Sequence, residues 1–335
     1  MTQTKSLVDI TAIEAARDRM AGTIHRTRTE RSAALSELAG VPVHLKLEHQ
    51  QRTGSFKLRG ATNAILSLSE EDRARGVVAV STGNHGRGLA YAARRNGVRC
   101  IVAMSELVPQ NKIDGVRAQG AEVLIVGHSQ DDAQVEVDRL VSEDGMTMVP
   151  PFDHPDIIAG QGTLGLELAE DLPDLACALV QLSGGGLISG VAAALKARIP
   201  GIRIIGVSME RGAAMYECIQ AGKPIHVEEM KTLADSLGGG IGLDNEYTFA
   251  MTRDLVDEIV LVNEAEIAAA IRHAYWAESQ IIEGSGSVGI AALLAGKVKP
   301  DGSTAVLLSG SNIDLKLHHR IVSGEDVDVD VTADA

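Results

Sequence analysis

Aromatic residues, cysteines and positive charges are all scarce in this sequence. Aromatic residues make up 2% of the 335 residues although hydrophobic residues make up 45%, so Ala, Val, Ile and Leu must fill the core. The three cysteines, Cys100, Cys177 and Cys218, form neither a CxxC pair nor a disulfide framework, which is typical of the reducing cytoplasm. We interpret each cysteine as a small buried apolar residue and expect a cytoplasmic location.

Basic residues are too few for a protein that binds nucleic acid or the surface of a membrane. The 31 Lys and Arg residues stand against 45 Asp and Glu, a formal net charge of −14, and this field repels phosphate backbones and anionic lipids. No run approaches the roughly 20 apolar residues of a membrane span. We therefore expect neither partner, and an anionic ligand has to be held by local devices such as backbone amides.

Short apolar runs alternate with helical patterns along most of the chain. The runs are nearly continuous, as in strands whose two faces are both covered. This alternation predicts parallel sheets, in which ligands bind beyond the carboxyl ends of the strands. The predicted strands are Val43–Leu47, Val77–Ser81, Arg99–Met104, Glu122–Val126, Ala178–Leu182, Ile202–Met209, Glu258–Val262 and Thr304–Leu308, and the predicted helices include Gly88–Asn96, Asp131–Glu143, Leu187–Ala197 and Glu264–Ser279.

The loop Ser183–Gly186 brings a serine and three glycines to the start of a predicted helix. Glycines let backbone N–H groups converge and the helix N-terminus adds positive potential, so the loop predicts a phosphate cradle. It is not a Walker loop, because the Gly-Lys-Ser/Thr ending is missing. Overlapping glycine spacings in Gly184–Gly190 leave a dinucleotide site open, and a plain tight turn is the structural alternative.

Two other glycine-marked turns carry reactive side chains. Lys57 lies beside Phe56 in a turn that opens a helix. The positive end of the helix dipole and the apolar ring of Phe56 both lower the pKa of the lysine, which makes its amine a nucleophile for a carbonyl. A solvated surface lysine is the alternative. The turn Ser81–Gly86 combines small residues with the amide of Asn84 and the imidazole of His85, and such a turn can present N–H groups and hydroxyls to a carboxylate.

Five motifs, in order, resemble the fold type II family of pyridoxal 5′-phosphate (PLP) enzymes, which contains the serine and threonine dehydratases and serine racemase. They are KLEHQQRTGSFKLRGA, STGNHGRGLAYAA, IAGQGTLGLEL, SGGGLISG and LLSGSNID, within a resemblance that runs from about Ile10 to about Leu315. It implies an α/β fold of the tryptophan synthase β-like type, with two open twisted domains, the cofactor in the cleft between them, and a homodimer. The implied large domain is 1–67 and 151–325, the small inserted domain is 68–150, and 326–335 would be a disordered acidic tail.

The resemblance also implies the roles of single residues. Lys57 would bind the cofactor covalently and move the Cα proton, and Thr82 is the second predicted catalytic residue. Phe56 would flank the ring, Asn84 would bond its 3-hydroxyl and Ser309 would face the pyridine nitrogen. The phosphate would be bound by Ser183, Gly184, Gly185, Gly186 and Leu187, and the carboxylate of a small amino-acid substrate by Ser81, Thr82, Asn84 and His85.

Some positions differ from their counterparts in the family. Ser183 replaces the first of four glycines, and Thr82 lies where the racemase has its serine. Ser208 and Ala214 occupy the places of two acidic cation ligands in the racemase, so no metal is expected. The segments Pro151–Pro155 and Ala234–Gly239, with Ser311, resemble the hydroxyectoine-utilisation dehydratase branch, which implies a hydroxylated diaminobutyrate derivative as substrate.

The implied reaction is β-elimination of a hydroxyl group from a small β-hydroxy amino acid. A hydroxyl such as that of Ser309 cannot keep the pyridine nitrogen protonated, so the ring is a mild electron sink and elimination fits better than transamination. Two enzyme alternatives are a broad serine/threonine ammonia-lyase and an amino-acid racemase. A PLP-binding regulatory protein is the alternative outside enzymes, and the presence of both Lys57 and Ser309 argues against it.

Overall fold

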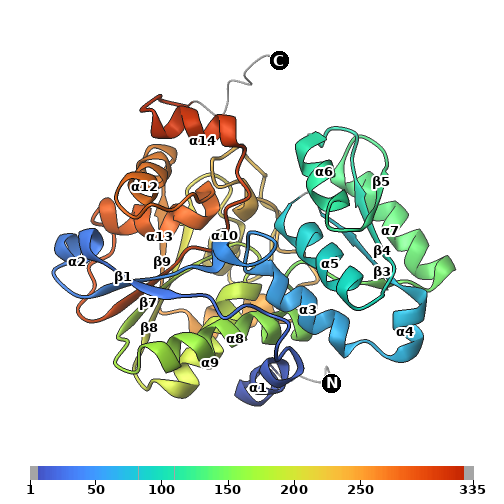
Figure 1. Ribbon diagram of the computed structural model, residues 1–335, viewed down its shortest axis with the longest axis horizontal. Coiled ribbons are helices and arrows are strands. Elements are labelled where there is room, and N and C mark those ends of the chain that lie inside the picture. Colours follow the sequence, from blue (N-terminus) through green and yellow to red (C-terminus); the bar gives the residue numbers. More distant parts are fainter. Residues whose placement is uncertain (1–6, 82, 109, 328–335) are drawn as a thin grey trace.

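Two β-sheets covered by helices make up the chain, which Figure 1 shows as a computed structural model describing residues 7–81, 83–108 and 110–327. The six-stranded sheet has the order β1-β2-β10-β7-β8-β9, and the four-stranded sheet has the order β5-β4-β3-β6. The strands are β1 (Thr29–Ser32), β2 (Val43–Lys46), β3 (Val77–Val80), β4 (Cys100–Met104), β5 (Glu122–Ile125), β6 (Thr147–Met148), β7 (Cys177–Gln181), β8 (Arg203–Met209), β9 (Glu258–Val262) and β10 (Thr304–Leu307).

Helices surround both sheets in the order of the chain. They are α1 (Ile10–Arg19), α2 (Ala33–Ala39), α3 (Lys57–Ser67), α4 (Glu70–Arg75), α5 (Asn84–Arg95), α6 (Gln110–Arg117), α7 (Gln130–Asp144), α8 (Pro155–Asp171), α9 (Gly186–Arg198), α10 (Ala214–Ala221), α11 (Thr248–Leu255), α12 (Glu264–Trp276), α13 (Gly284–Leu294) and α14 (Leu315–Val322), with the 3-10 turns η1 (Glu48–Gln50) and η2 (Asp235–Leu237). None of the helices within the described residues has the length and apolar character needed to cross a bilayer.

All eight predicted strands are present, and their ends shift by at most one residue. The eight predicted strands pair in parallel, as predicted, but an additional edge strand that was not predicted, β1, pairs with β2 in the antiparallel direction. This edge strand reads Thr-Glu-Arg-Ser and has one buried residue, so it lacks the apolar signal on which the prediction depended. The two-residue strand β6 is too short to give such a signal.

The last strand of the chain lies in the middle of the larger sheet. β10 pairs in parallel with β2 on one side and β7 on the other, with Thr304 opposite both Val43 and Cys177. The carboxyl ends of these three strands therefore meet at one edge of the sheet. The loops that follow β7 and β10 become neighbours there, although about 125 residues separate them in the sequence.

The smaller sheet comes from one continuous stretch, with β3, β4 and β6 in parallel register and α7 and α5 packed against it. Figure 1 shows it beside the larger sheet, with α3 and α4 leading into it. Helix α5 begins at Asn84 rather than at the predicted Gly88, and α12 ends at Trp276 rather than Ser279. The domain limits stay a prediction. Residues 328–335 of the predicted tail lie outside the described residues.

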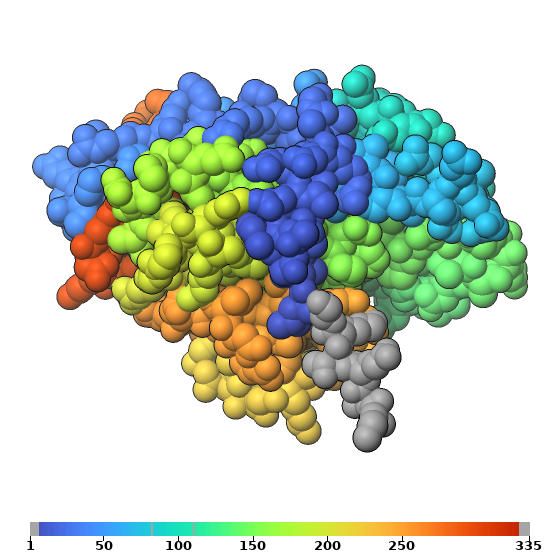
Figure 2. Space-filling model, turned by 90° about the horizontal axis from the view of Figure 1, so that it is seen from below, coloured from blue at the N-terminus to red at the C-terminus, as the bar shows by residue number. Residues whose placement is uncertain are grey.

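Helix α8 crosses α9 and α3 so closely that glycine is required at both crossings. A Cβ atom at Gly190 would lie 2.3 Å from the backbone oxygen of Ile158, and one at Gly160 would lie 2.7 Å from the Cα of Gly60 in α3. Helix α1 packs on α8 and α9 through a cluster that includes Ile13, and Figure 2 shows its dark blue residues beside the yellow-green ones of α9. This packing fixes α3 and α9, whose N-termini both point into the cleft described next.

Candidate active site

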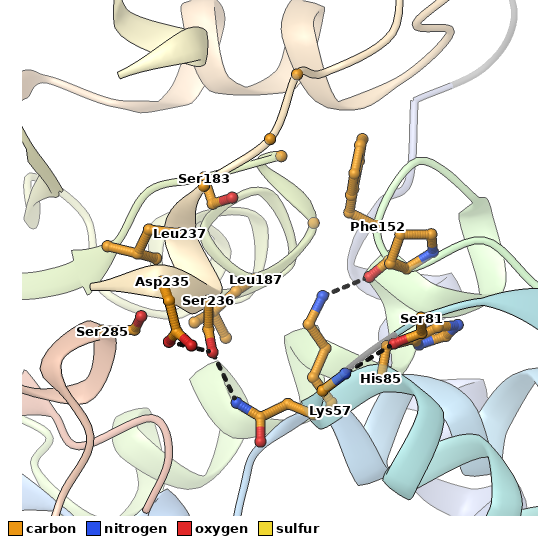
Figure 3. Close-up of a pocket in the computed structure, with 18 of the residues that line it drawn as sticks. Lys57, Ser81, His85, Phe152, Ser183, Leu187, Asp235, Ser236, Leu237 and Ser285 are labelled. Carbon is orange, nitrogen blue, oxygen red and sulfur yellow. Dashed lines mark hydrogen bonds between the residues drawn. The ribbon is translucent and has the colours of Figure 1, made fainter. Parts of the chain in front are cut away.

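A cavity of about 530 Å³ lies at the carboxyl edge of the larger sheet, between it and the start of α5 (Figure 3). This volume is within the range of about 300–1,000 Å³ found for small-molecule sites. The structure brings together in its lining every predicted site residue that it describes. These are Phe56, Lys57, Ser81, Asn84, His85, Ser183, Gly184, Gly185, Gly186, Leu187 and Ser309, whereas Thr82 lies outside the described residues.

The loop after β7 presents a row of backbone N–H groups to this cavity. No acceptor in the described part of the chain takes up the N–H groups of residues 183–188. Gly185, in the left-handed region at φ +87°, caps α9 without a side-chain hydrogen bond. Free amides at a helix N-terminus attract an anion, because the helix dipole adds to their own partial charge. The geometry therefore suits one phosphate group.

Bulky neighbours explain why this loop is built of glycine. A Cβ at Gly184 would lie 2.4 Å from the ring of Phe152, and one at Gly186 would lie 2.9 Å from its Cα. A Cβ at Gly185 would lie 2.9 Å from Met215, Thr248 and Thr252, and the positive φ would add strain. The loop is thus held from two sides by elements that leave its amides facing the cavity.

Lys57 is the first residue of α3, and its amine lies in the same cavity. The Nζ atom donates a hydrogen bond to the backbone oxygen of Pro151 at 2.6 Å, which Figure 3 shows, and lies 5.5 Å from the centre of the Phe56 ring. Burial lowers the pKa of Lys57 from 10.5 to about 8. At neutral pH a larger share of the Lys57 amine than of an ordinary lysine is therefore uncharged and able to act as a nucleophile.

The turn at the start of α5 is organised by its own side chains. The hydroxyl oxygen of Ser81 accepts hydrogen bonds from the N–H groups of Gly83, at 3.4 Å, and Gly86, at 2.9 Å. His85 donates from Nε2 to the backbone oxygen of Val149 at 2.8 Å. Burial, together with the charge of Lys57, lowers the pKa of His85 to about 3, so the imidazole is neutral. Its Nδ1 is buried and has no hydrogen-bond partner among the described residues.

Two residues that the sequence interpretation did not assign surround Asn84. Glu283, which begins the turn into α13, accepts from Asn84 Nδ2 at 2.7 Å and from the N–H group of Asn312 at 2.9 Å. Burial, and then the charge of Asp235, raise the pKa of Glu283 to about 7. The acid follows no motif of its own, and its one local signal is its place just before a glycine-rich apolar helix.

Ser309 reaches the cavity through the loop that follows β10. Its backbone oxygen accepts from the N–H group of Phe56 at 3.0 Å, and Ser55 forms an isolated β-bridge with Gly310. These bonds hold the Ser309 loop directly against the loop that carries Lys57. The central position of β10 therefore places the predicted ring-nitrogen partner beside the predicted nucleophile.

A buried ion-pair network holds the first turn of α3 against the larger sheet and α8. Arg59, which is 1% exposed, donates to both carboxylate oxygens of Glu48 at 2.7 and 2.8 Å and to both oxygens of Glu167 at 2.7 and 2.9 Å. The Nζ atom of Lys46, which is fully buried, lies 2.7 Å from Oε2 of Glu167, an oxygen that Arg59 also bonds. Because Arg59 lies two residues beyond Lys57, the network holds the first turn of α3 in place.

Comparison with known proteins identifies the chemistry of this cavity. The model of the family described as pyridoxal-phosphate dependent enzyme matches residues 20–310. The chain belongs to this family. A putative threonine dehydratase of Sinorhizobium fredii is 61% identical over 320 residues, which cover 95% of this chain and 96% of that protein. An L-threonine ammonia-lyase of Thermotoga maritima is 40% identical over 317 residues, which cover 95% of this chain and 79% of that protein.

A solved structure agrees with these sequence relatives. Maize serine racemase is 32% identical, has a TM-score of 0.89, and the match covers 94% of this chain and 97% of that one. The chain is thus a PLP-dependent lyase of the threonine/serine dehydratase-like group with the fold type II architecture, as predicted. The described residues hold no group of three or more His, Cys, Asp or Glu side chains that could ligate a metal.

The residues of the cavity fit pyridoxal phosphate. The unpaired amides of the 183–187 loop would hold the phosphate, Lys57 would bind the aldehyde carbon, and Ser309 would lie at the ring nitrogen. When bound, the cofactor supplies an electron sink for a carbanion at Cα, and the protein supplies orientation and charge. The roles of Asn84, His85 and the other single residues stay predictions.

Proposed function

We propose that this enzyme removes the hydroxyl group of a small β-hydroxy amino acid by β-elimination, releasing an oxo acid and ammonia. The observation that carries the proposal is the desolvated amine of Lys57, which lies opposite a phosphate-type cradle and beside the Ser309 loop. The names of the relatives, threonine dehydratase and L-threonine ammonia-lyase, describe the same reaction class.

Each residue contributes a step that suits elimination. Lys57, as a neutral amine, takes the proton from Cα and is held at the correct place by its bond to Pro151. Ser309 would offer a hydroxyl and no carboxylate to the ring nitrogen of the bound cofactor, which would then supply a mild electron sink, and this favours β-elimination over transamination. His85 is neutral and buried, so it adds no second positive charge beside the amine of Lys57.

We further propose that the substrate is a hydroxylated diaminobutyrate derivative formed in the breakdown of hydroxyectoine. Four acidic residues, Asp131, Glu229, Asp235 and Glu283, line the cavity. Lys112, the one lysine in the lining besides Lys57, lies 3.0 Å from Asp235. The excess of negative charge favours a substrate whose side chain carries a second amine over one with an acidic side chain.

A panel of β-hydroxy amino acids tests both parts of the proposal. We would compare kcat/KM for threonine, serine, 3-hydroxyaspartate and 3-hydroxy-2,4-diaminobutyrate, assaying both oxo acid and inverted amino acid. The diamino substrate should be preferred and 3-hydroxyaspartate should be the poorest. Inversion without oxo acid would contradict elimination, whereas a preference for 3-hydroxyaspartate or equal rates for all would overturn the substrate assignment alone.

Isosteric variants show whether the carboxylates cause the preference. Glu229→Gln and Asp131→Asn should lower kcat/KM for the diamino substrate by roughly tenfold, since a charged hydrogen bond is worth about 1.5–3 kcal/mol. The same variants should leave threonine turnover nearly unchanged. Equal losses for both substrates would show that these acids do not select the side chain.

A further inference from the structure

We propose that Arg87 is a positioning residue that fixes the side-chain amide of Asn84 in the cleft by acting through Asn312. The inference does not depend on which amino acid is the substrate. Asn84 is predicted to bond the ring of the cofactor, so the direction in which its amide points decides whether it presents a donor or an acceptor there. Nothing in the sequence motifs assigns a role to Arg87.

A continuous hydrogen-bond chain connects these residues. Arg87 donates from Nη1 to the Oδ1 of Asn312 at 3.0 Å. Asn312 donates from Nδ2 to the Oδ1 of Asn84 at 2.5 Å and to the backbone oxygen of Thr53 at 2.9 Å. Asn84 in turn donates from Nδ2 to Glu283 at 2.7 Å. Arg87 and Asn84 lie three residues apart on α5 and therefore on one face of the helix.

The groups that face Asn312 determine the direction of its amide and so of the bonds that follow it. A guanidinium group has only donors and a backbone carbonyl oxygen has only acceptors, whatever the protonation state of Glu283. Because Arg87 can only donate and the backbone oxygen of Thr53 can only accept, the oxygen of Asn312 faces Arg87 and its NH₂ group faces Thr53 and Asn84. The oxygen of Asn84 is then used by Asn312, so its NH₂ group points toward Glu283 and the cavity, where Ser236 Oγ lies 3.4 Å away.

The surroundings leave these side chains little freedom to rearrange. Arg87 is partly buried, and a Cβ at Gly115 of α6 would lie 2.3 Å from its Nη2. A Cβ at Gly54 would lie 2.7 Å from the Oδ1 of Asn312, so that glycine provides the space for the amide. The N–H group of Asn312 also bonds Glu283, which closes the chain into a ring. The start of α5 is thereby joined to the loops that carry Lys57 and Ser309.

Removal of the guanidinium would remove one of the two constraints on the direction of the Asn312 amide and leave the backbone oxygen of Thr53 as the other. The Oδ1 of Asn312 would lose its charged donor while it stays partly buried, and an unsatisfied acceptor of this kind is costly. Rotation of the Asn312 amide would relieve this cost at the expense of its bond to Thr53, and in the molecules that rotate, Asn84 would have to rotate as well to keep their mutual bond. Asn84 would then turn its oxygen toward Glu283 and the cavity, where an acceptor repels both the carboxylate and a ring oxygen.

The test compares Arg87→Met, which removes the donors, with Arg87→Lys, which retains a side chain that can only donate. Arg94→Met is the matched control, because Arg94 is on the same helix and its Nη1 bonds a backbone oxygen, that of Ala118, at an exposed site. The readouts are the Kd for PLP in titrations of the apoprotein, the visible absorbance band of the bound cofactor and the melting temperature.

Arg87→Met should weaken PLP binding roughly tenfold and shift the absorbance band, whereas Arg87→Lys should restore most of both. Arg94→Met should change neither. A purely structural role would lower the melting temperature of Arg87→Met and leave the Kd and the band as in the parent enzyme, and that result would overturn the proposal. Equal defects in Arg87→Lys and Arg87→Met would overturn it as well, because they would show that shape rather than donor character matters.

Discussion

The amine of Lys57 lies 2.6 Å from the backbone oxygen of Pro151, and the next residue, Phe152, packs against Gly184 and Gly186. One loop therefore touches both the nucleophile and the phosphate cradle. The carboxylate of Asp153 anchors this loop by accepting three backbone N–H bonds at the start of α11. The distance between the amine and the cradle is thus set by a loop that is itself tied to the larger sheet's helices.

Replacement of Lys57 by alanine should abolish turnover. Proton transfer by a positioned side chain contributes about 10²–10⁴-fold, and Lys57 also provides the covalent attachment, so oxo-acid formation should fall by at least that factor. Borohydride treatment of the parent enzyme should fix the chromophore on Lys57, and peptide mapping would locate it. Lys112→Ala, which removes the other lysine lining the cavity, should still be labelled. Labelling of Lys57→Ala would contradict the assignment.

The capture of PLP by the apoprotein should depend on pH with a midpoint near 8. Burial lowers the pKa of Lys57 to about 8, so the fraction of neutral amine rises with pH and levels off above that value. The capture rate should follow, measured as growth of the visible absorbance after mixing. Nα-acetyl-lysine is the control, because its unburied amine titrates at about 10.4. A midpoint for the apoprotein near that of the control would show that Lys57 is not desolvated.

The sequence predicted the parts of the fold that carry a local signal. Continuous apolar runs located the eight predicted strands, and in β3, β4 and β7 every residue is buried, as expected where both faces of a parallel strand are covered. The polar edge strand Thr29–Ser32 gave no such signal, because its side chains need no apolar pattern to pair with β2. The start of α5 was placed four residues late, since Asn84, His85 and Gly86 are all residues typical of turns.

The site shows the same division between local and long-range information. Lys57 and the 183–187 loop are recognisable because each is a short motif that makes its own geometry. Glu283 and Asn312 are single polar residues whose meeting with Asn84 depends on the position of β10 between β2 and β7. No pattern within either segment contains that information.

Gly184→Ala should weaken both the fold and the binding of PLP. The new Cβ would lie 2.4 Å from the Phe152 ring, and overpacking of this kind costs about 1–3 kcal/mol. Phe152→Leu, which shortens the obstructing side chain, should recover part of the loss in the double variant, as measured by unfolding free energies and by the Kd for PLP in a double-mutant cycle. If the two changes were additive, the contact between Phe152 and Gly184 would not be what excludes a side chain there.

Arg59→Met should be severely destabilising, whereas Arg75→Met should not. Arg59 is buried between Glu48 and Glu167, and removal of one partner from a buried pair costs about 3–5 kcal/mol because the other charge stays unpaired. Arg75 pairs with Glu71 and Asp72 at the surface, where water screens the charges, so the loss of these pairs should change stability little. Chemical denaturation of both variants would measure the difference.

The loss in Arg59→Met should also depend on pH. Burial disfavours the ionised form of Glu48, but the charge of Arg59 outweighs it and holds the pKa of Glu48 below its usual value of 4.5. Without Arg59 the hydrogen bond from Thr27 and the charge of Lys46 still lower the pKa of Glu48, but each is a smaller effect than burial, so the pKa rises and the carboxyl takes up a proton more readily in mildly acidic solution. The destabilisation should therefore be smaller at pH 5 than at pH 8, and Glu48→Gln in the Arg59→Met background should remove this dependence. A loss that is the same at both pH values would mean that the penalty comes from packing rather than from an unpaired charge.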